Sequence, residues 1–340
     1  MSSTNLPLSV TARAGINIAL VKYWGKRDPD LNLPATGSLS LTLANLGSET
    51  TVRFASDARS PEGEDRISVD GAPAPARFAE RVRRFLDLVR RAAHLDLPAE
   101  VATCNSVSTA AGLASSAAGF AALALAASRA AGMTLAPSEL SALARRGSGS
   151  AARSIFGGFV EMAPGERSDG SDACARALLP ADAWDVRLVV AITAEGPKAI
   201  GSSESMELTA KTSPYYPGWL QAVPQDLAAA RAAVRAQDLT GLGRVAERNA
   251  MRMHACALAA DPPILYWNAA TLAAMETVRR LRASGSEAFF TIDAGPHVKV
   301  LCAACAAAVV ESALAGTPGI LRTLVLAPGP GAEILREERR

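Results

Sequence analysis

Three segments of the sequence combine small residues with groups that can bind or transfer charge. They are residues 22–26, 108–119 and 146–153, and lysine and arginine are the only charged residues in them. Arginine suits carboxylates and phosphates because its planar guanidinium presents a fork of N–H donors. Together the segments predict a site for a polyanionic substrate.

The loop at residues 108–119 reads STAAGLASSAAG and follows a β-like run at residues 100–104. It opens into an alanine-rich, helix-forming stretch at residues 117–131. Such a loop lets backbone N–H groups approach an anion, and the helix dipole favours negative charge there. Ser115 and Ser116 add hydroxyls that suit a phosphate oxygen or a metal ion. It is not a Walker A loop, because no Gly-Lys-Ser/Thr follows. On this stretch alone, phosphate binding and a packed helix N-terminus with a serine cap are equal alternatives.

One carboxylate complements these basic segments. Asp293 ends an apolar run at residues 287–293, directly before Ala-Gly-Pro. A carboxylate fixed at the end of a strand is a candidate proton acceptor. The local alternative is an aspartate that only forms a turn. Lys22, Lys26 and Arg27 likewise have the alternative of an exposed charged loop.

The histidines and cysteines do not form a metal site by their spacing. His254 falls on an expected core helix, His94 on the surface, and His297 after the Gly-Pro near Asp293. Cys302 and Cys305 form a single CxxC inside an apolar run, which favours a buried pair of small residues over zinc or redox chemistry.

The elements that position these groups alternate irregularly and include a hairpin signal, which favours an α+β fold over a doubly wound sheet. A domain boundary near Asp182 predicts an N-terminal domain at residues 1–182 and a C-terminal domain at residues 183–340. The expected strands are residues 6–12, 38–43, 49–55, 67–69, 155–161, 184–193, 287–293, 298–301 and 322–327. The expected helices are residues 77–93, 117–131, 137–146, 202–211, 218–236, 239–260, 269–283 and 303–315.

The composition excludes several classes of protein. The chain has 340 residues, of which 49% are hydrophobic, so a sizeable core can form. The net charge is only +2 and no basic block occurs, which argues against nucleic acid as a partner. No apolar run is long enough for a membrane span and no signal peptide is evident, so we expect no membrane partner. Five scattered cysteines predict a reducing, cytoplasmic location.

Taken together, the segments resemble the diphosphomevalonate decarboxylases of the GHMP kinase superfamily. Six motifs carry the resemblance and run in order along nearly the whole chain. They are NIALVKYWGKR at residues 17–27, TAAGLASSAAGF at residues 109–120, RGSGSAARS at residues 146–154, SSESM at residues 202–206 with Thr212 and Ser213, PPILYWN at residues 262–268, and DAGP at residues 293–296.

This resemblance implies a two-domain GHMP kinase fold with the active site in the cleft between the domains. It implies ATP as co-substrate, Mg²⁺ as cofactor, mevalonate 5-diphosphate as the small-molecule substrate and a homodimer as the assembly. The tertiary hydroxyl is phosphorylated, and phosphate and CO2 then leave to give isopentenyl diphosphate. Phosphoryl transfer needs mainly positioning and charge neutralisation, which fits the basic segments.

The resemblance also assigns roles to residues of this chain. Asp293 handles the hydroxyl proton, Lys22 beside it binds phosphate charge and keeps it ionised, and Arg153 holds the substrate carboxylate. The remaining substrate contacts are Tyr23, Lys26, Ser148, Ser150 and Ser202. The nucleotide loop comprises Ser108, Gly112, Leu113, Ala114, Ser115 and Ser116, and the last two are also the candidate magnesium ligands.

The sequence departs from the family pattern in three of its motifs. Val107-Ser108 stands where the family has Phe-Pro, Ser205 replaces a glycine, and His297 replaces an asparagine. None of them removes a charged group. The alternatives are a relative that acts on mevalonate 5-phosphate and, from another class, a non-catalytic ligand-binding protein on the same scaffold.

Overall fold

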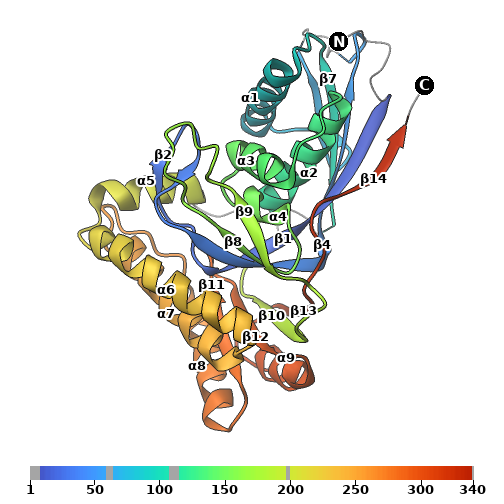
Figure 1. The fold of residues 1–340 in the computed structure, drawn as a ribbon. Helices are drawn as coiled ribbons and strands as arrows, with labels where there is room; N and C mark the ends of the chain where they lie inside the picture. The colour runs from blue at the N-terminus through green and yellow to red at the C-terminus, as the bar shows by residue number, and fades with distance from the viewer. Residues whose placement is uncertain (1–7, 59–63, 107–114, 197–199, 339–340) are drawn as a thin grey trace.

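The structure is a computed structural model that describes residues 8–58, 64–106, 115–196 and 200–338. Figure 1 shows two halves, each built on its own sheet with helices packed against it. This mixture of helices and largely antiparallel strands confirms the predicted α+β class.

The larger sheet is centred on two long strands, β1 (Ser9–Val21) and β4 (Ser38–Phe54), which pair antiparallel. We expected β4 as two separate strands, at residues 38–43 and 49–55. Instead the strand continues through residues 44–48, and the register against β1 shifts beside Gly15. The two strands approach so closely there that a side chain on Gly47 would strike the Ala14 carbonyl. The other strands of this sheet are β5 (Arg66–Val69), β6 (Ala72–Pro73), β7 (Ala99–Asn105), β8 (Phe159–Met162), β9 (Ala175–Leu179) and β14 (Glu333–Glu338).

The helices of this half, among the residues that the structure describes, are α1 (Ala76–Ala93), α2 (Ser115–Ala130), α3 (Pro137–Gly147) and α4 (Ala151–Ser154). α1 buries apolar residues at helical spacing, from Ala79 to Val89, and exposes its basic face. α3 begins with Pro137, and the side chain of Glu139 accepts a hydrogen bond from the Ala136 N–H. The end of α3 leads directly into the serine-rich segment before α4.

The smaller sheet has the order β11-β12-β10-β13 and is antiparallel. Its strands are β10 (Val186–Ile192), β11 (Ala288–Ile292), β12 (Val298–Ala303) and β13 (Arg322–Leu326). The helices of this half are α5 (Ser202–Thr212), α6 (Tyr216–Ala236), α7 (Leu239–Leu258), α8 (Ala269–Ala283), η3 (Ala304–Ala306) and α9 (Ala307–Ala315). β2 (Lys26–Asp28) and β3 (Leu33–Pro34) form a separate small ribbon.

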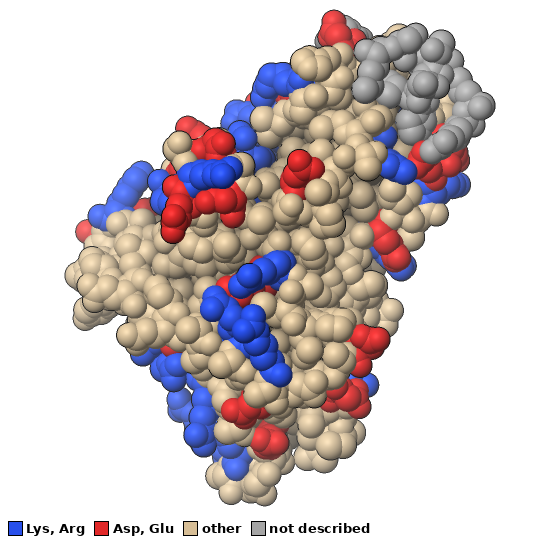
Figure 2. All heavy atoms as spheres, viewed as in Figure 1, with Lys and Arg blue, Asp and Glu red and all other residues tan. Residues whose placement is uncertain are grey.

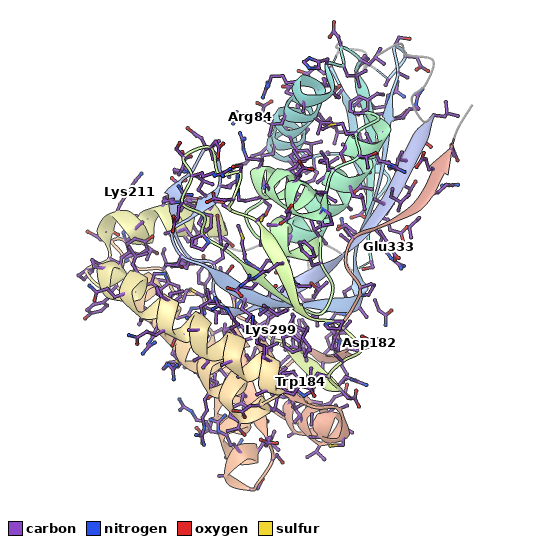
Figure 3. The ribbon with its side chains drawn as sticks, in the orientation of Figure 1. Arg84, Asp182, Trp184, Lys211, Lys299 and Glu333 are labelled. Atoms are coloured by element: carbon purple, nitrogen blue, oxygen red, sulfur yellow. The ribbon has the colours of Figure 1, made fainter. Side chains whose placement is uncertain are left out.

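One hydrophobic core joins the two halves. It combines Ile18 and Leu41 of the larger sheet with Leu188 of the smaller one and with apolar residues of α6 and α7. At the junction, which Figure 3 marks with the labels of Asp182 and Trp184, the Trp184 ring packs 5.2 Å from that of Phe159. The two sheets are therefore held against each other by apolar burial.

The chain does not end with the strand expected at residues 322–327. β14 follows it and pairs antiparallel with β1, so the chain returns to the larger sheet. The boundary predicted between residues 182 and 183 stays a prediction.

The surface shows no expanse of a single charge on the side seen in Figure 2, where acidic and basic side chains lie in small mixed groups. Within the described residues, every helix is too short or too polar to cross a lipid bilayer.

Candidate active site

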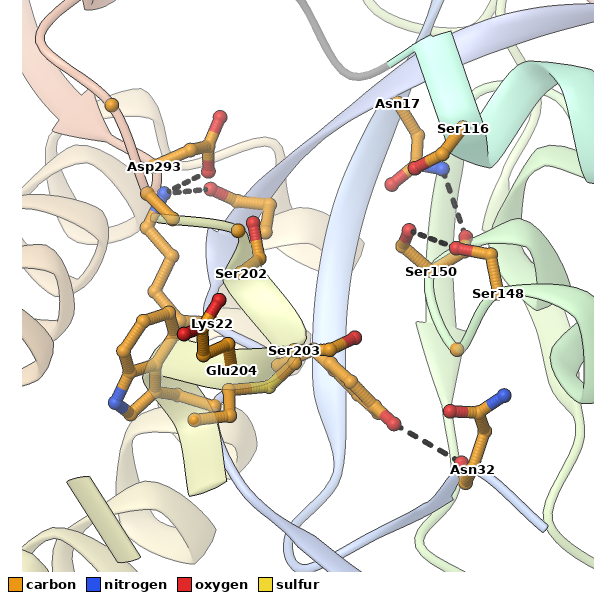
Figure 4. Close-up of a pocket in the computed structure, with 18 of the residues that line it drawn as sticks. Asn17, Lys22, Asn32, Ser116, Ser148, Ser150, Ser202, Ser203, Glu204 and Asp293 are labelled. Carbon is orange, nitrogen blue, oxygen red and sulfur yellow. Dashed lines mark hydrogen bonds and ion pairs between the residues drawn. The ribbon is translucent and has the colours of Figure 1, made fainter. Parts of the chain in front are cut away.

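A cavity of about 670 Å³ is lined by residues of both halves. In Figure 4, Asp293 and Ser202 face Asn17, Ser116 and Ser150 across its open space. The predicted site residues that line it are Lys22, Tyr23, Lys26, Ser116, Ser148, Ser150, Arg153, Ser202 and Asp293. Segments far apart in the sequence therefore meet where the resemblance placed the active site.

Asp293 lies just beyond the end of β11 and forms an ion pair with Lys22, which lies just beyond the end of β1. Lys22 Nζ is 2.7 Å from Asp293 Oδ1 and also donates to the Ala19 carbonyl at 2.7 Å. Burial raises the pKa of the Asp293 carboxyl, but the ammonium groups of Lys22 and Lys299 outweigh it and hold this pKa well below its usual range. The carboxylate is thus ionised and fixed at the edge of the cavity.

Lys22 is itself almost fully buried, which lowers its pKa to about 8 although Asp293 opposes the shift. Its backbone N–H donates to Asn249 Oδ1 on α7 at 2.8 Å. Asn249 in turn donates to the buried carboxylate of Asp226 on α6. Asp226 also accepts hydrogen bonds from Arg248 and Arg252. Two helices of the smaller half therefore hold the turn that carries Lys22.

Arg153 is buried in the short helix α4, with 2% of its surface exposed. Its Nη1 donates to Ser38 Oγ at 2.7 Å and its Nη2 to Asn17 Oδ1 at 3.1 Å. No carboxylate in the described residues pairs with it, and its buried Nε–H has no protein partner there. Burial lowers its pKa to about 10. The guanidinium is oriented by neutral acceptors and retains N–H donors for a ligand.

The hydroxyl and ammonium groups of the other expected substrate contacts lie around the same space. The Tyr23 hydroxyl donates to the Asn32 carbonyl at 3.0 Å, and burial raises its pKa, so it remains a neutral donor. Burial lowers the pKa of Lys26, whose Nζ donates to Ser203 Oγ at 3.3 Å. Ser148 and Ser150 lie on the turn between α3 and α4, and their hydroxyls are 3.4 Å apart. Ser202 is the first residue of α5.

Most of the expected nucleotide loop lies outside the described residues. This applies to Ser108, Gly112, Leu113 and Ala114, whose predicted roles the structure does not address. Ser115 is the first residue of α2, and Ser116 lines the cavity. In the described part of the chain, no three His, Cys, Asp or Glu residues cluster as a metal site. Such a site is not needed for Mg²⁺, which is commonly held by substrate phosphates and one or two protein groups.

Several cavity residues were missed by the sequence analysis. Arg77 and Arg81 of α1 line it, and neither was among the predicted site residues. Lys299 and His297 line it as well. The basic character of Arg77 and Arg81 is visible in the sequence. Their place in the site was missed because α1 lies far from the other motifs along the chain.

The charges of the cavity lining are strongly asymmetric. Among the described residues that line it, the acidic ones are Glu204 and Asp293, and the basic ones are Lys22, Lys26, Arg77, Arg81, Arg153 and Lys299. A low-dielectric cavity with this excess of positive charge attracts a polyanion, as the sequence predicted.

The other histidine and cysteine predictions have mixed outcomes. His254 is buried in α7, where burial lowers its pKa to about 3, and His94 is exposed; both were predicted correctly. Cys302 is buried but Cys305 is exposed, so the expected buried pair is wrong. Cys305 lies in η3, a turn that lifts it away from the core after β12 ends.

Comparison with known proteins accounts for this arrangement. Residues 14–175 match the diphosphomevalonate decarboxylase-like N-terminal domain, and residues 188–316 match the mevalonate 5-diphosphate decarboxylase C-terminal domain. A diphosphomevalonate decarboxylase of Aspergillus fumigatus is 36% identical over 85% of this chain and 76% of its own length. The human diphosphomevalonate decarboxylase is 35% identical over 88% of this chain and 78% of its own.

Solved structures agree with these matches. The crystal structure of mevalonate diphosphate decarboxylase from Staphylococcus aureus has a TM-score of 0.90 and 36% identity, over 96% of this chain and 98% of its own. MDDEF in complex with MVAPP, AMPPCP and magnesium has a TM-score of 0.89 and 40% identity, over 97% and 99% of the two chains. The chain therefore belongs to the diphosphomevalonate decarboxylase family and has its two-domain GHMP kinase fold, as the six motifs predicted.

Proposed function

We propose that this protein catalyses the ATP-dependent decarboxylation of mevalonate 5-diphosphate. The products are isopentenyl diphosphate, ADP, phosphate and CO2. The observation that carries the proposal is a single cavity that holds both the ionised Asp293, in contact with Lys22, and the buried guanidinium of Arg153, which has no carboxylate partner among the described residues. Such a cavity suits a substrate with a hydroxyl, a carboxylate and a diphosphate.

Asp293 is the group proposed to accept the proton of the tertiary hydroxyl. Its pKa ensures that it is ionised at neutral pH, and Lys22 fixes one of its oxygens. A strongly acidic carboxyl is a weak base, so Asp293 orients the hydroxyl and takes its proton late in the transfer. When bound, ATP supplies the phosphoryl group and Mg²⁺ neutralises phosphate charge.

Arg153 is proposed to hold the substrate carboxylate until the phosphorylated C–O bond breaks and CO2 departs. Its remaining N–H donors suit two carboxylate oxygens. The other end of the substrate, the diphosphate, is assigned to Tyr23, Lys26, Ser148, Ser150 and Ser202, whose donors line the same cavity. Two anionic ends on separate groups leave the tertiary hydroxyl between them.

For the nucleotide, the proposal places ATP phosphates at the N-terminus of α2, with Ser115 and Ser116 as hydroxyl ligands for Mg²⁺. α2 begins at Ser115, and Ser116 faces the cavity in Figure 4. A helix of 16 residues presents free N–H groups and a positive dipole end to phosphate.

The decisive experiment measures CO2 and ADP together with mevalonate 5-diphosphate and with mevalonate 5-phosphate. One ADP for each CO2 from the diphosphate supports the proposal. ADP without CO2, or no turnover of either compound, contradicts it. A preference for the monophosphate assigns the protein to the alternative substrate.

Three further properties belong to the same proposal: domains at residues 1–182 and 183–340, the second of which returns its last strand, β14, to the sheet of the first, a homodimer, and a cytoplasmic location. Five free cysteines fit a reducing compartment. Light scattering on the purified protein tests the assembly, since a mass near twice 35.1 kDa is expected.

A further inference from the structure

Lys299 occupies a position where the strand pattern calls for an apolar residue. Along β12, Val298, Val300 and Cys302 face one hydrophobic cluster, whereas Leu301 faces the core that joins the two halves. Lys299 alternates with Val298 and Val300 and so lies on the same side as Leu301. Only 3% of its surface is exposed, and lysine is almost never buried to this extent without a partner.

Within the described residues, Lys299 forms an ion pair with Asp293. Lys299 Nζ is 3.1 Å from Asp293 Oδ2, while Lys22 takes Oδ1. Each carboxylate oxygen therefore has an ammonium group of its own, one from the end of β1 and one from β12. Lys299 pairs in register with Thr291 of β11, which anchors it two residues from Asp293 along the neighbouring strand.

Burying an ammonium group is costly, and one ion pair with a carboxylate that already has a cation does not offset that cost well. An apolar residue of similar size would give this strand a more stable core. The position of Lys299 is therefore better explained by what it does to Asp293 than by what it adds to folding.

We propose that Lys299 is a positioning residue for the reaction, which fixes the second oxygen of Asp293 so that the carboxylate has one orientation toward the substrate hydroxyl. This inference rests on the proposed function. With Lys22 alone, the carboxylate can turn about the bond to its Cβ and still keep one ion pair. With both ammonium groups, rotation breaks at least one contact.

The other ionisable groups near Asp293 do not replace Lys299. Burial keeps His254 on α7 neutral, with a pKa of about 3, and its Nε2 lies 3.3 Å from the Ile292 carbonyl. Arg153 on α4 is held by Ser38 and Asn17. Among the described residues, neither forms a hydrogen bond or ion pair with the carboxylate of Asp293, which pairs with Lys22 and Lys299.

The test is a double-mutant cycle on kcat with Lys299→Met and Asp293→Asn. Alone, Lys299→Met is expected to lower kcat on the order of 10- to 100-fold, because a small misplacement of a reacting group has this effect. KM changes little, since Lys299 acts through Asp293 rather than on the substrate. In the Asp293→Asn background, adding Lys299→Met changes kcat by less than about twofold, because a shared role makes the losses non-additive.

The matched control is Lys211→Met, which removes an exposed lysine of α5 that does not line the cavity (Figure 3) and leaves kcat unchanged. If Lys299→Met does not fold, Lys299→Gln, which keeps a donor but not the charge, takes its place in the cycle. Additive losses, a raised KM at constant kcat, or full activity of Lys299→Met would overturn the inference. An inactive parent protein would overturn the proposed function as well, whereas an active parent with additive losses would overturn the role of Lys299 alone.

Discussion

Replacing Arg153 should weaken binding of the carboxylate end of the substrate and leave binding of the diphosphate end unchanged. The guanidinium has five N–H donors, of which the structure commits one to Ser38 and one to Asn17, while the Nε–H has no protein partner. Besides this buried Nε–H, one N–H of Nη1 and one of Nη2 have no partner in the described residues, and these two are the donors assigned to the carboxylate. Arg153→Met removes them and the charge, and it roughly preserves the volume of a side chain that is 2% exposed.

The size of the effect follows from these contacts. Hydrogen bonds to a charged group are worth about 1.5–3 kcal/mol, so losing the carboxylate contact costs about 2 kcal/mol. Since 1.4 kcal/mol corresponds to a tenfold change, the Kd for mevalonate 5-diphosphate rises about 30-fold. Isopentenyl diphosphate keeps the diphosphate but has no carboxylate, so its Kd changes by less than about twofold.

Isothermal titration calorimetry with both compounds measures this difference. Lys26→Met is the contrasting variant, because Lys26 is assigned to the diphosphate end and should weaken both compounds by the same factor. Circular dichroism confirms that Arg153→Met is folded, since the variant also leaves the Ser38 and Asn17 acceptors without their donor. An equal loss for the two compounds in Arg153→Met would refute the assignment of the two ends.

Four other changes test the site and its supports. Asp293→Asn keeps the shape of the side chain but cannot take a proton, so kcat falls about 1,000-fold with little change in KM. A steady-state rate above a tenth of the parent's would show that Asp293 does not accept the proton. Lys22 has a pKa of about 8, so kcat/KM declines above that pH as its charge is lost. This folded-state pKa lies below the ordinary 10.5, so between about pH 8 and pH 10.5 the unfolded chain binds one more proton than the folded chain, and the contribution of Lys22 to stability rises with pH. Urea unfolding of the parent and of Lys22→Met across this pH range measures that rise. Asp226→Ala leaves the buried amide of Asn249 without its acceptor, whereas Arg248 and Arg252 are 46% and 41% exposed and turn to water; the change should cost about 1–3 kcal/mol in urea unfolding, and a loss below about 0.5 kcal/mol would show that the network is dispensable. Gly149→Ala places a methyl group against the Tyr23 hydroxyl and should cost about 1–3 kcal/mol, and an unchanged melting temperature would contradict that contact.

Local patterns predicted most elements of the fold because their signals are short-range. The helix at residues 269–283 has the same bounds in the structure, and the amphipathic helix at residues 77–93 differs by one residue. β14 was missed because its sequence, EILREE, is highly charged, as suits an edge strand whose outer side faces water. Its pairing with β1 spans more than 300 residues of sequence, which no local pattern reveals.

The site shows the same division between local and long-range information. Lys22, Arg153 and Asp293 stood in recognisable motifs, and the structure brings them to one cavity. Lys299 lies in residues 298–301, which were predicted only as a strand. A lysine on a strand indicates a functional site only when the structure shows that its side chain points into the protein. Arg81 was hidden for a related reason, since an amphipathic helix predicts a basic face without saying what that face meets.

The return of β14 to the larger sheet also determines how the smaller half is connected. The chain leaves the larger sheet after β9 and returns to it before β14. The adjacent residues Gly157 and Gly158 contact both of these connecting segments. A side chain on Gly158 would strike the backbone at residues 179–181, and one on Gly157 would strike the backbone at residues 329–331. The smaller half is thus topologically an insertion whose entry and exit are neighbours, so its two ends can be joined by a short linker. The described chain ends at the larger sheet, where Ser9 and Glu338 are paired, which makes the molecule suited to circular permutation.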